Sequence, residues 1–234
     1  MVSDEQNAHS SLAGGEDLFE NRRDAGRQLA DELTEFDLPD TIVLALPRGG
    51  VVVGYEVASF LGVALDVLIS RKVGAPGNPE LAVGAVAEIG GLWADRLTVD
   101  TLGVPPEYLR EEVDRQLLEI DRMIKVYRQG RELPPLDGRT VIVVDDGVAT
   151  GYTMLAAVKG VREAHPKELV AATPLASQEA LWRISREADR TVCLMTPQPF
   201  YAVGYHFSEF DQLTDEDVVR YLQDAQRQLG ARRE

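Results

Sequence analysis

The stretch Val141 to Thr153, VIVVDDGVATGYT, decides the expected fold of this chain. Its first four residues are all β-branched, which is typical of a short strand buried on both faces of a parallel sheet. Asp145 and Asp146 follow where this strand must end, and an apolar pattern with helical spacing begins at Met154. The stretch therefore predicts a strand, a turn of small residues and then a helix.

The turn combines two kinds of polar group. Backbone N–H groups at a helix start bind anions, Gly147 and Gly151 let the backbone approach a phosphate, and the hydroxyls of Thr150 and Thr153 add donors. Carboxylates do not hold a phosphate, but they accept hydrogen bonds from sugar hydroxyls and bind hydrated divalent cations. These groups together predict a sugar-phosphate site. An ordinary turn with capping residues is the simpler alternative, but paired acids with two threonines and two glycines exceed what capping needs.

Strands and helices alternate along the rest of the chain, which predicts an α/β protein with a parallel twisted sheet and flanking helices. The other expected strands are TIVLAL (41–46), LDVLISRK (65–72), ELVAATPLAS (168–177) and TVCLMTP (191–197). Expected helices cover 21–36, about 51–61, 105–130, 177–188 and roughly 215–229, and a β-hairpin is expected over 82–94. Ligands of such sheets bind beyond the carboxyl ends of the strands, where the polar motifs fall.

A length of 234 residues suits one domain with appendages. We expect residues 1–18 to form a disordered tail and 19–234 a single domain, with a core over about 41–197 and a hood and terminal helix over 198–234. The tail lacks the basic segment and apolar core of a secretory signal, and a lone Cys193 is compatible with a reducing compartment. We therefore expect a cytoplasmic protein.

The net charge of −15, with twenty Arg and four Lys, argues against a nucleic-acid-binding surface. Glu56 and Asp66 interrupt the apolar residues 51–69, so no membrane span is expected. An acidic surface with few lysines is also what a salt-rich cytoplasm would favour, although a plain solvated surface explains it equally. The three histidines lack metal-ligand spacing, so no structural zinc site is predicted.

The central stretch resembles the 5-phosphoribosyl-1-pyrophosphate (PRPP) motif of type I phosphoribosyltransferases: four apolar residues, two acids and a small-residue loop that ends in T-G-x-T. Pro47-Arg48-Gly49-Gly50, after the first strand, resembles the loop with which this family binds pyrophosphate. A Walker loop is excluded because no Gly-Lys-Ser/Thr follows the glycines. The resemblance covers about 41–197. The whole chain, from RRDAG to AVGYHFSEF, also looks like a subgroup of predicted phosphoribosyltransferases to which family membership assigns no acceptor.

The resemblance implies a role for each matching residue. Asp145 and Asp146 would hold the ribose hydroxyls and Mg²⁺, directly or through water, and Lys72 would begin a mobile flap over 73–81 and join them as a catalytic residue. The 5′-phosphate would be bound by Gly147, Val148, Ala149, Thr150, Gly151 and Thr153, and the pyrophosphate by Arg48, Gly49, Gly50 and Arg71. Glu80 and Glu88, near the flap, are candidates for a general base, and Glu88 is the one we assign.

The segment QPFYAVGYHFSEF (198–210) holds five of the fifteen aromatic residues. The family has a hood that contacts the nucleobase, so the resemblance implies that Phe200, Tyr201, Tyr205 and Phe207 stack on the acceptor. The alternative is that these rings dock the terminal helix onto the domain. Ala149 stands where hypoxanthine-guanine enzymes of the family have an acid, which puts a 6-oxopurine acceptor in doubt.

The expected function is transfer of the 5-phosphoribosyl group of PRPP to a small nitrogenous acceptor, a nucleobase, with release of pyrophosphate. A homodimer is expected, because the helix over 105–130 carries an apolar stripe of Leu109, Val113, Leu117, Ile120 and Ile124, although this stripe would equally pack on the sheet. The alternative function is an inactive PRPP-sensing regulator that acts through a protein partner.

Overall fold

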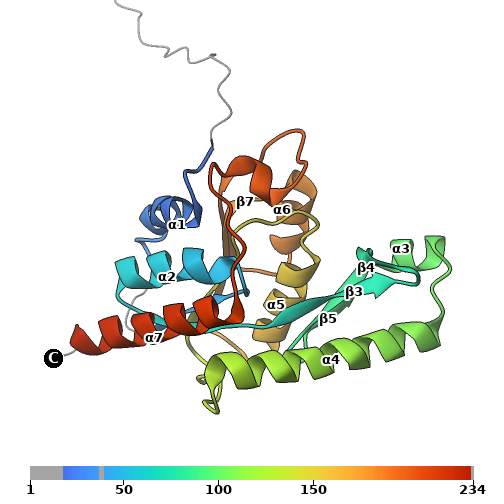
Figure 1. The fold of residues 1–234 in the computed structure, drawn as a ribbon, viewed down its shortest axis with the longest axis horizontal. Helices are drawn as coiled ribbons and strands as arrows, with labels where there is room; N and C mark the ends of the chain where they lie inside the picture. The colour runs from blue at the N-terminus through green and yellow to red at the C-terminus, as the bar shows by residue number, and fades with distance from the viewer. Residues whose placement is uncertain (1–17, 37–39, 233–234) are drawn as a thin grey trace, which may run out of the picture.

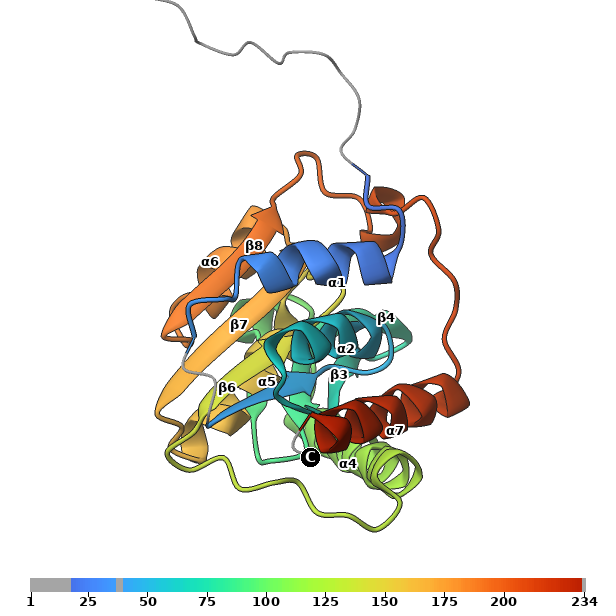
Figure 2. The same cartoon turned by 90° about the vertical axis from the view of Figure 1, so that its left-hand side faces the viewer.

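A five-stranded parallel sheet forms the centre of the computed structural model, which describes residues 18–36 and 40–232. Its strand order is β2-β1-β6-β7-β8, and every neighbouring pair is parallel (Figure 2). The strands are β1 (Thr41–Ala45), β2 (Ala64–Val67), β6 (Thr140–Val144), β7 (Glu168–Leu175) and β8 (Arg190–Met195). The expected α/β fold with a parallel sheet is therefore confirmed.

Helices cover both faces of this sheet. α1 (Arg22–Asp31) and α2 (Gly50–Leu61) lie on one face, and α5 (Tyr152–Glu163) and α6 (Gln178–Ile184) lie on the other. Side chains alternate along β6, so Val141 and Val143 pack with α5 while Ile142 and Val144 pack with α1 and α2. This two-sided burial explains why the strand reads as a continuous β-branched run.

A second, antiparallel sheet extends to one side of the core (Figure 1). It consists of β3 (Ser70–Ala75), β4 (Asn78–Ala87) and β5 (Leu92–Ala94), and it is followed by the short α3 (Arg96–Thr101) and the long α4 (Pro106–Arg128). β4 and β5 form the expected hairpin over 82–94. The sheet, α3 and part of α4 together make an arm, which the sequence pattern did not predict.

The expected strand over 65–72 is wrong, because this segment contributes to two sheets. β2 ends at Val67 beside β1, and β3 begins at Ser70 in the arm. The apolar run continues through Leu68 and Ile69, which are both fully buried, so hydrophobic periodicity carries no sign of the change of sheet.

The segment over 73–81, expected to be a loop, is largely strand. β3 continues to Ala75, and β4 begins at Asn78 after a turn in which Gly77 has a φ of +73°. A register shift follows Gly74, where a Cβ would lie 2.7 Å from Cα of Pro79. Glycine and proline here form a bulge and a tight turn rather than an open loop.

The terminal segments meet at the carboxyl end of the sheet. The backbone of Phe19 forms a bridge with that of Phe207, next to the 3₁₀ helix η1 (Val203–His206). α7 (Asp215–Ala231) begins at a capping box formed by Thr214 and Asp217 and packs against α2 and α4. Apart from Leu18, the tail predicted over 1–18 lies outside the described residues.

Two helix predictions need correction. The first helix ends at Asp31 rather than at 36, although Leu33 and Phe36 beyond it are buried as expected. On α4 the buried apolar residues are Ile120, Met123 and Tyr127, and Leu117 of the expected stripe is exposed. Leu109, Val113 and Ile124 of the stripe are partly buried in the same core, where α4 packs against β3, β4 and α7.

Candidate functional site

The paired acids lie beside the glycines of the Pro47–Gly50 loop. Because β1 and β6 are parallel neighbours, the residues that follow them meet at one edge of the sheet. A Cβ at Gly49 would overlap the carboxylate of Asp146, and a Cβ at Gly50 would lie 2.9 Å from Cα of Asp145. Only glycine fits at these two positions, so the loop and the acids form one continuous surface. We call the carboxylates of Asp145 and Asp146 the acid ledge.

Burial, the neighbouring carboxylate and Arg22 all influence the ionisation of Asp145 in the acid ledge. Burial and the neighbouring carboxylate of Asp146 raise the pKa of Asp145 well above its usual value, and Arg22 opposes this rise. Nε of Arg22 donates to Oδ2 of Asp146 at 2.6 Å, and the two side chains are 11% and 14% exposed. Arg22 is a site residue that sequence reasoning missed, since a charged residue in an amphipathic helix normally indicates a solvated face.

The loop from Gly147 to Gly151 turns its carbonyl groups away from the acid ledge. The carbonyl of Val148 accepts from the backbone of Ser177 at 2.9 Å, that of Ala149 from the Ser177 hydroxyl at 2.6 Å, and that of Thr150 from Nη1 of Arg183 at 3.2 Å. All three donors come from the start and the body of α6 or from its cap. This orientation of the carbonyls favours N–H groups on the opposite side of the loop, as an anion site requires.

Donors remain available in the same loop. The N–H groups of Ala149, Thr150 and Gly151 have no acceptor among the described residues. Gly151 has a φ of +81° and stands at the start of α5, whose first turn, with Thr153, has no side-chain cap. The residues predicted to bind a 5′-phosphate therefore lie together at a helix N-terminus next to the acid ledge, and their donors suit a phosphate group.

Arg48 borders a cavity of about 230 Å³ on the other side of the acid ledge. The cavity is lined by Arg22, Arg48, Gly49 and residues 210–213. The Arg48 side chain is half-exposed, and its Nη1 lies 3.9 Å from Oδ1 of Asp215, so this guanidinium is only loosely held. Its position beside Gly49 suits it to contact an anion on this loop.

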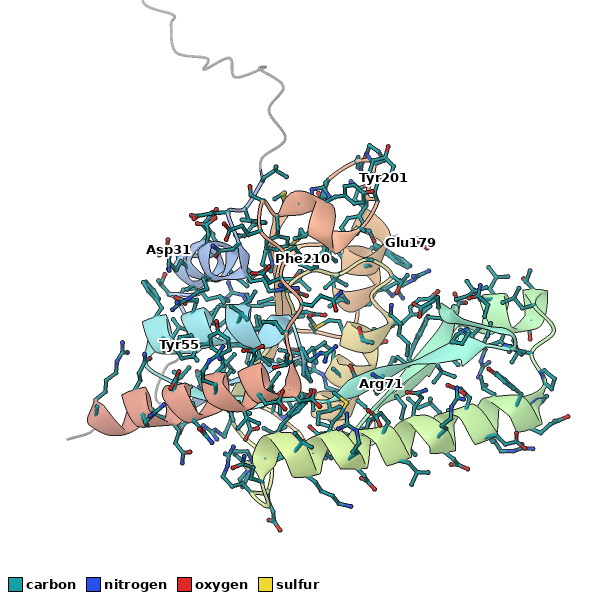
Figure 3. The ribbon with its side chains drawn as sticks, in the orientation of Figure 1. Asp31, Tyr55, Arg71, Glu179, Tyr201 and Phe210 are labelled. Atoms are coloured by element: carbon teal, nitrogen blue, oxygen red, sulfur yellow. The ribbon has the colours of Figure 1, made fainter. Side chains whose placement is uncertain are left out.

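The two basic residues of β3 differ in their surroundings. Nε of Arg71 donates to Oε1 of Gln116 on α4 at 3.0 Å, and Figure 3 shows Arg71 in the arm near α4. This contact holds Nε of Arg71 against α4, and the predicted pyrophosphate role of Arg71 stays a prediction. The side chain of Lys72 is exposed on the arm. The strand alternation that separates neighbouring side chains accounts for the difference.

Glu88 is not placed as a general base would be. Its two carboxylate oxygens accept from the two terminal nitrogens of Arg128 at 2.6 Å, and Oε1 also accepts from the backbone of Ile69. The Glu88 and Arg128 side chains are each 3% exposed. The structure thus assigns Glu88 to a buried ion pair at the base of the arm. Glu80, the other candidate, is exposed on β4.

The four predicted acceptor-stacking residues separate into two groups. Phe207 is buried, its ring lies 5.4 Å from that of Phe19, and it joins the terminal segments into a small core; Phe200 packs against that core. Tyr201 and Tyr205 are 74% and 71% exposed, and their rings are 6.1 Å apart. These two tyrosines border a cavity of about 660 Å³ after β8. Phe207 therefore docks the amino-terminal segment onto the sheet, and not the terminal helix, which was the alternative for these rings.

The hood also contacts the loop from Gly147 to Gly151. A Cβ at Gly147 would collide with the methyl groups of Val203, which belongs to η1. This close approach requires glycine at position 147. η1 therefore lies between two regions. Tyr205 and His206 of this helix line the 660 Å³ cavity, and Val203 contacts Gly147, the residue that follows the acid ledge.

The acid ledge suits a Mg²⁺ ion that arrives with a phosphorylated ligand. Among residues 18–36 and 40–232, no group of three or more His, Cys, Asp or Glu side chains is placed to hold a metal ion. Mg²⁺ is usually bound by one or two carboxylates with water and substrate phosphates completing its octahedron. The two carboxylates of the ledge match that donor set.

Within the same described ranges, no helix has the length and apolar character of a membrane-crossing segment.

Comparison with known proteins identifies the family of this chain. A phosphoribosyl transferase domain model matches residues 15–205, so the chain belongs to that family. A Mycobacterium tuberculosis protein named "Putative phosphoribosyl transferase Rv0571c" is 41% identical over 213 residues, which are 91% of this chain and 48% of that protein. TT1426 from Thermus thermophilus has a crystal structure with a TM-score of 0.75 and 44% identity, over 88% of this chain and 98% of that one. The chain spans about half the length of the curated relatives that it matches.

Proposed function

We propose that this protein transfers the 5-phosphoribosyl group of PRPP to a small nitrogenous acceptor, a nucleobase, and releases pyrophosphate. The observation that carries this proposal is the direct contact between the acid ledge and Gly49 and Gly50, next to the amide-lined loop of 147–151. A ribose ring that lies on the acids can reach a phosphate site on one side and a pyrophosphate site on the other. Membership of the phosphoribosyl transferase family supports the reaction class.

The acid ledge would both hold and stabilise the sugar. Carboxylate oxygens of Asp145 and Asp146 accept hydrogen bonds from the 2′- and 3′-hydroxyls. As pyrophosphate leaves C1, positive charge develops at C1 and the ring oxygen. A carboxylate 4 Å away would stabilise this charge by about 1 kcal/mol in water but by about 4 kcal/mol at an effective dielectric constant of 20. Exclusion of water from the site therefore matters energetically.

The leaving group would be bound by the loop after β1. The N–H groups of Gly49 and Gly50 and the guanidinium of Arg48 provide donors for pyrophosphate, and Lys72 would add charge from the arm. Mg²⁺, held by the acid ledge, would supply positive charge to the pyrophosphate oxygens when it is bound. Glu88 has no part in this proposal, because it is bonded elsewhere, and the pyrophosphate role of Arg71 stays a prediction.

The acceptor would bind below the hood, where Tyr201 and Tyr205 offer exposed rings to a planar base. Stacking is tolerant of ring type, so these tyrosines do not select between purines and pyrimidines. Ala149 leaves the acceptor without the carboxylate that a 6-oxopurine site would contain. A cytoplasmic homodimer that is adapted to high salt stays a prediction from the sequence.

The proposal is tested by an acceptor screen. The protein is incubated with PRPP, Mg²⁺ and single nucleobases or other nitrogenous heterocycles, at low and at high salt, and pyrophosphate release is measured. Release that depends on one class of acceptor is the expected result. Saturable PRPP binding by calorimetry without turnover for any acceptor would instead favour the PRPP-sensing regulator, and absence of PRPP binding would contradict both functions.

A further inference from the structure

Arg22 stands outside the PRPP motif, yet its guanidinium is held by three different groups around the acid ledge. Nε donates to Oδ2 of Asp146 at 2.6 Å, and Nη1 donates to the backbone carbonyl of Asp211 at 2.8 Å. The guanidinium carbon lies 3.7 Å from the centre of the Phe210 ring. A planar group with several fixed donors can make these contacts at the same time, whereas a lysine ammonium cannot.

The contact with Asp146 orients the carboxylate without filling it. Arg22 bonds Oδ2 of this carboxylate and not Oδ1, and the Asp145 carboxyl lies close enough to donate to the Asp146 carboxylate when it is protonated. Oδ1 keeps its capacity to accept a hydrogen bond from a ligand. The carboxylate is also limited by Gly49, whose missing side chain leaves the space that it occupies. Asp146 is therefore fixed on two sides and open on one.

We propose that Arg22 is a positioning residue for the sugar-binding carboxylate of Asp146, supplied by the first helix, and that it links this carboxylate to the Phe210–Asp211 segment of the hood. The inference rests on the proposed function, because it assumes that Asp146 accepts a hydrogen bond from ribose. It assigns to α1 a part in PRPP binding that the motif itself does not contain.

The contacts of Arg22 with Phe210 and Asp211 couple the hood to the carboxylate of Asp146. The segment connects η1 with α7, and the Phe210 ring packs 5.2 Å from that of Phe207 and against Gly204. Figure 3 shows Phe210 between the hood and the centre of the molecule. The guanidinium of Arg22 therefore joins the hood to the acid ledge, in addition to the contact of Val203 with Gly147, so we expect a change at Arg22 to alter the sugar site more than the loop of 147–151.

Arg23 provides a matched control on the same helix. Its Nε donates to Oε1 of Glu56 at 2.6 Å, which resembles the Arg22–Asp146 bond in length, but the Arg23 side chain is 51% exposed and Glu56 lies on α2. Loss of this pair removes the same charge and an equally short contact from α1. It leaves every group of the acid ledge in place.

The test compares Arg22→Gln, Arg22→Lys and Arg23→Gln by calorimetric titration with PRPP and Mg²⁺ and, without Mg²⁺, with ribose 5-phosphate and with pyrophosphate. Arg22→Gln should weaken PRPP and ribose 5-phosphate binding about ten-fold, as expected for one lost charge-assisted contact, and change pyrophosphate binding less than about two-fold. Arg22→Lys should not restore the affinity, because it cannot keep all three contacts. Arg23→Gln should bind all three ligands like the unaltered protein.

The other outcomes overturn the inference. Equal or tighter PRPP binding by Arg22→Gln would show that the guanidinium does not position Asp146 for the sugar. Equal weakening of all three ligands, or the same loss in Arg23→Gln, would indicate a general effect of α1 on the fold. Recovery in Arg22→Lys would show that charge alone matters. If the unaltered protein binds neither PRPP nor ribose 5-phosphate, the proposed function fails first.

Discussion

Two clusters in this molecule each place a nearly buried arginine beside two carboxylates, and they are bonded differently; in the first, the exposed Arg131 also lies 3.7 Å from Asp66. At the base of the arm, Arg128 donates to both oxygens of Glu88 at 2.6 Å and to Asp66 at 3.2 Å. At the acid ledge, Arg22 bonds a single oxygen of Asp146 and donates no hydrogen bond to Asp145 in the described part of the chain. The first cluster is almost fully buried, while the second is partly open.

The difference separates a structural cluster from a binding site. Buried charges require partners for nearly every donor and acceptor, and Arg128 also donates to the carbonyl of Val67 at 2.6 Å. Its cluster joins α4, β2 and the end of β4. The acid ledge instead keeps carboxylate oxygens without donors, and burial raises the pKa of Asp145. Unsatisfied acceptors next to free N–H groups are what a ligand can complete.

The largest effect is expected from breaking the buried cluster. Arg128→Met leaves Asp66 and Glu88 without their shared partner, which should lower the free energy of unfolding by about 3–5 kcal/mol. Urea denaturation measures this change. Arg227→Met is the control, because Arg227 pairs with Asp224 on the exposed side of α7 and should matter little. Equal losses in the two variants would remove the distinction between the clusters.

The second effect concerns the open cluster. Asp146→Asn should lower PRPP turnover about 100-fold, as is typical when a group that stabilises developing charge is removed, and should leave the urea midpoint nearly unchanged. Glu88→Gln should do the reverse: the urea midpoint falls, and the pH profile of turnover keeps its shape. A pH profile that loses one limb in Glu88→Gln would restore Glu88 as a general base.

A smaller effect, on ribose 5-phosphate binding, is expected at the loop of Gly147–Gly151. Arg183→Gln removes the donor to the Thr150 carbonyl, so the loop is less well ordered for an anion. We expect ribose 5-phosphate binding to weaken about five-fold, which corresponds to about 1 kcal/mol. Arg186→Gln, in the turn just after α6, is the control in the same titration, because its guanidinium lies over Trp182. Equal affinities for both variants would separate α6 from the phosphate site.

The smallest effect is a pH dependence of stability. Because the pKa of Asp145 is raised by burial and by Asp146, its folded form binds a proton more strongly than the unfolded chain does. The stability that this proton contributes is present below the unfolded pKa and is lost as pH rises through the folded value. Asp145→Asn should thus exceed the unaltered protein in stability at neutral pH, and the gain should shrink on acidification. Urea midpoints from pH 4 to 8 measure this, and a loss at neutral pH would contradict it.

Most of the fold could be predicted from the sequence, because the strands and helices of the parallel sheet have strong local sequence patterns. The β-branched run of β6 and the alternation of strands and helices follow from two-sided burial, and Thr214 with Asp217 caps α7 as the sequence indicates. The separate antiparallel sheet of the arm could not be predicted. Its first strand continues the apolar run of β2, and its glycines and prolines form a bulge and a turn within a hairpin rather than a loop.

The site could be predicted from the sequence where its residues belong to a motif at the end of a strand, as at Asp145–Gly151 and at the Pro47–Gly50 loop. The acid ledge and the loop of 147–151 form one motif, so their proximity follows from a single strand–helix turn. Arg22 comes from a helix 124 positions away, and the pairing of Glu88 with Arg128 joins residues 40 positions apart. Periodicity says which face of a helix is apolar, but it does not say which charged residue meets a partner across the fold.

A crystal structure of the protein with PRPP and Mg²⁺ tests the central claim most directly. The account predicts that the 2′- and 3′-hydroxyls of the ribose lie within hydrogen-bond distance of Asp145 and Asp146, and that the 5′-phosphate lies on the N–H groups of 149–151. Ribose bound elsewhere, or a 5′-phosphate away from this loop, would contradict it.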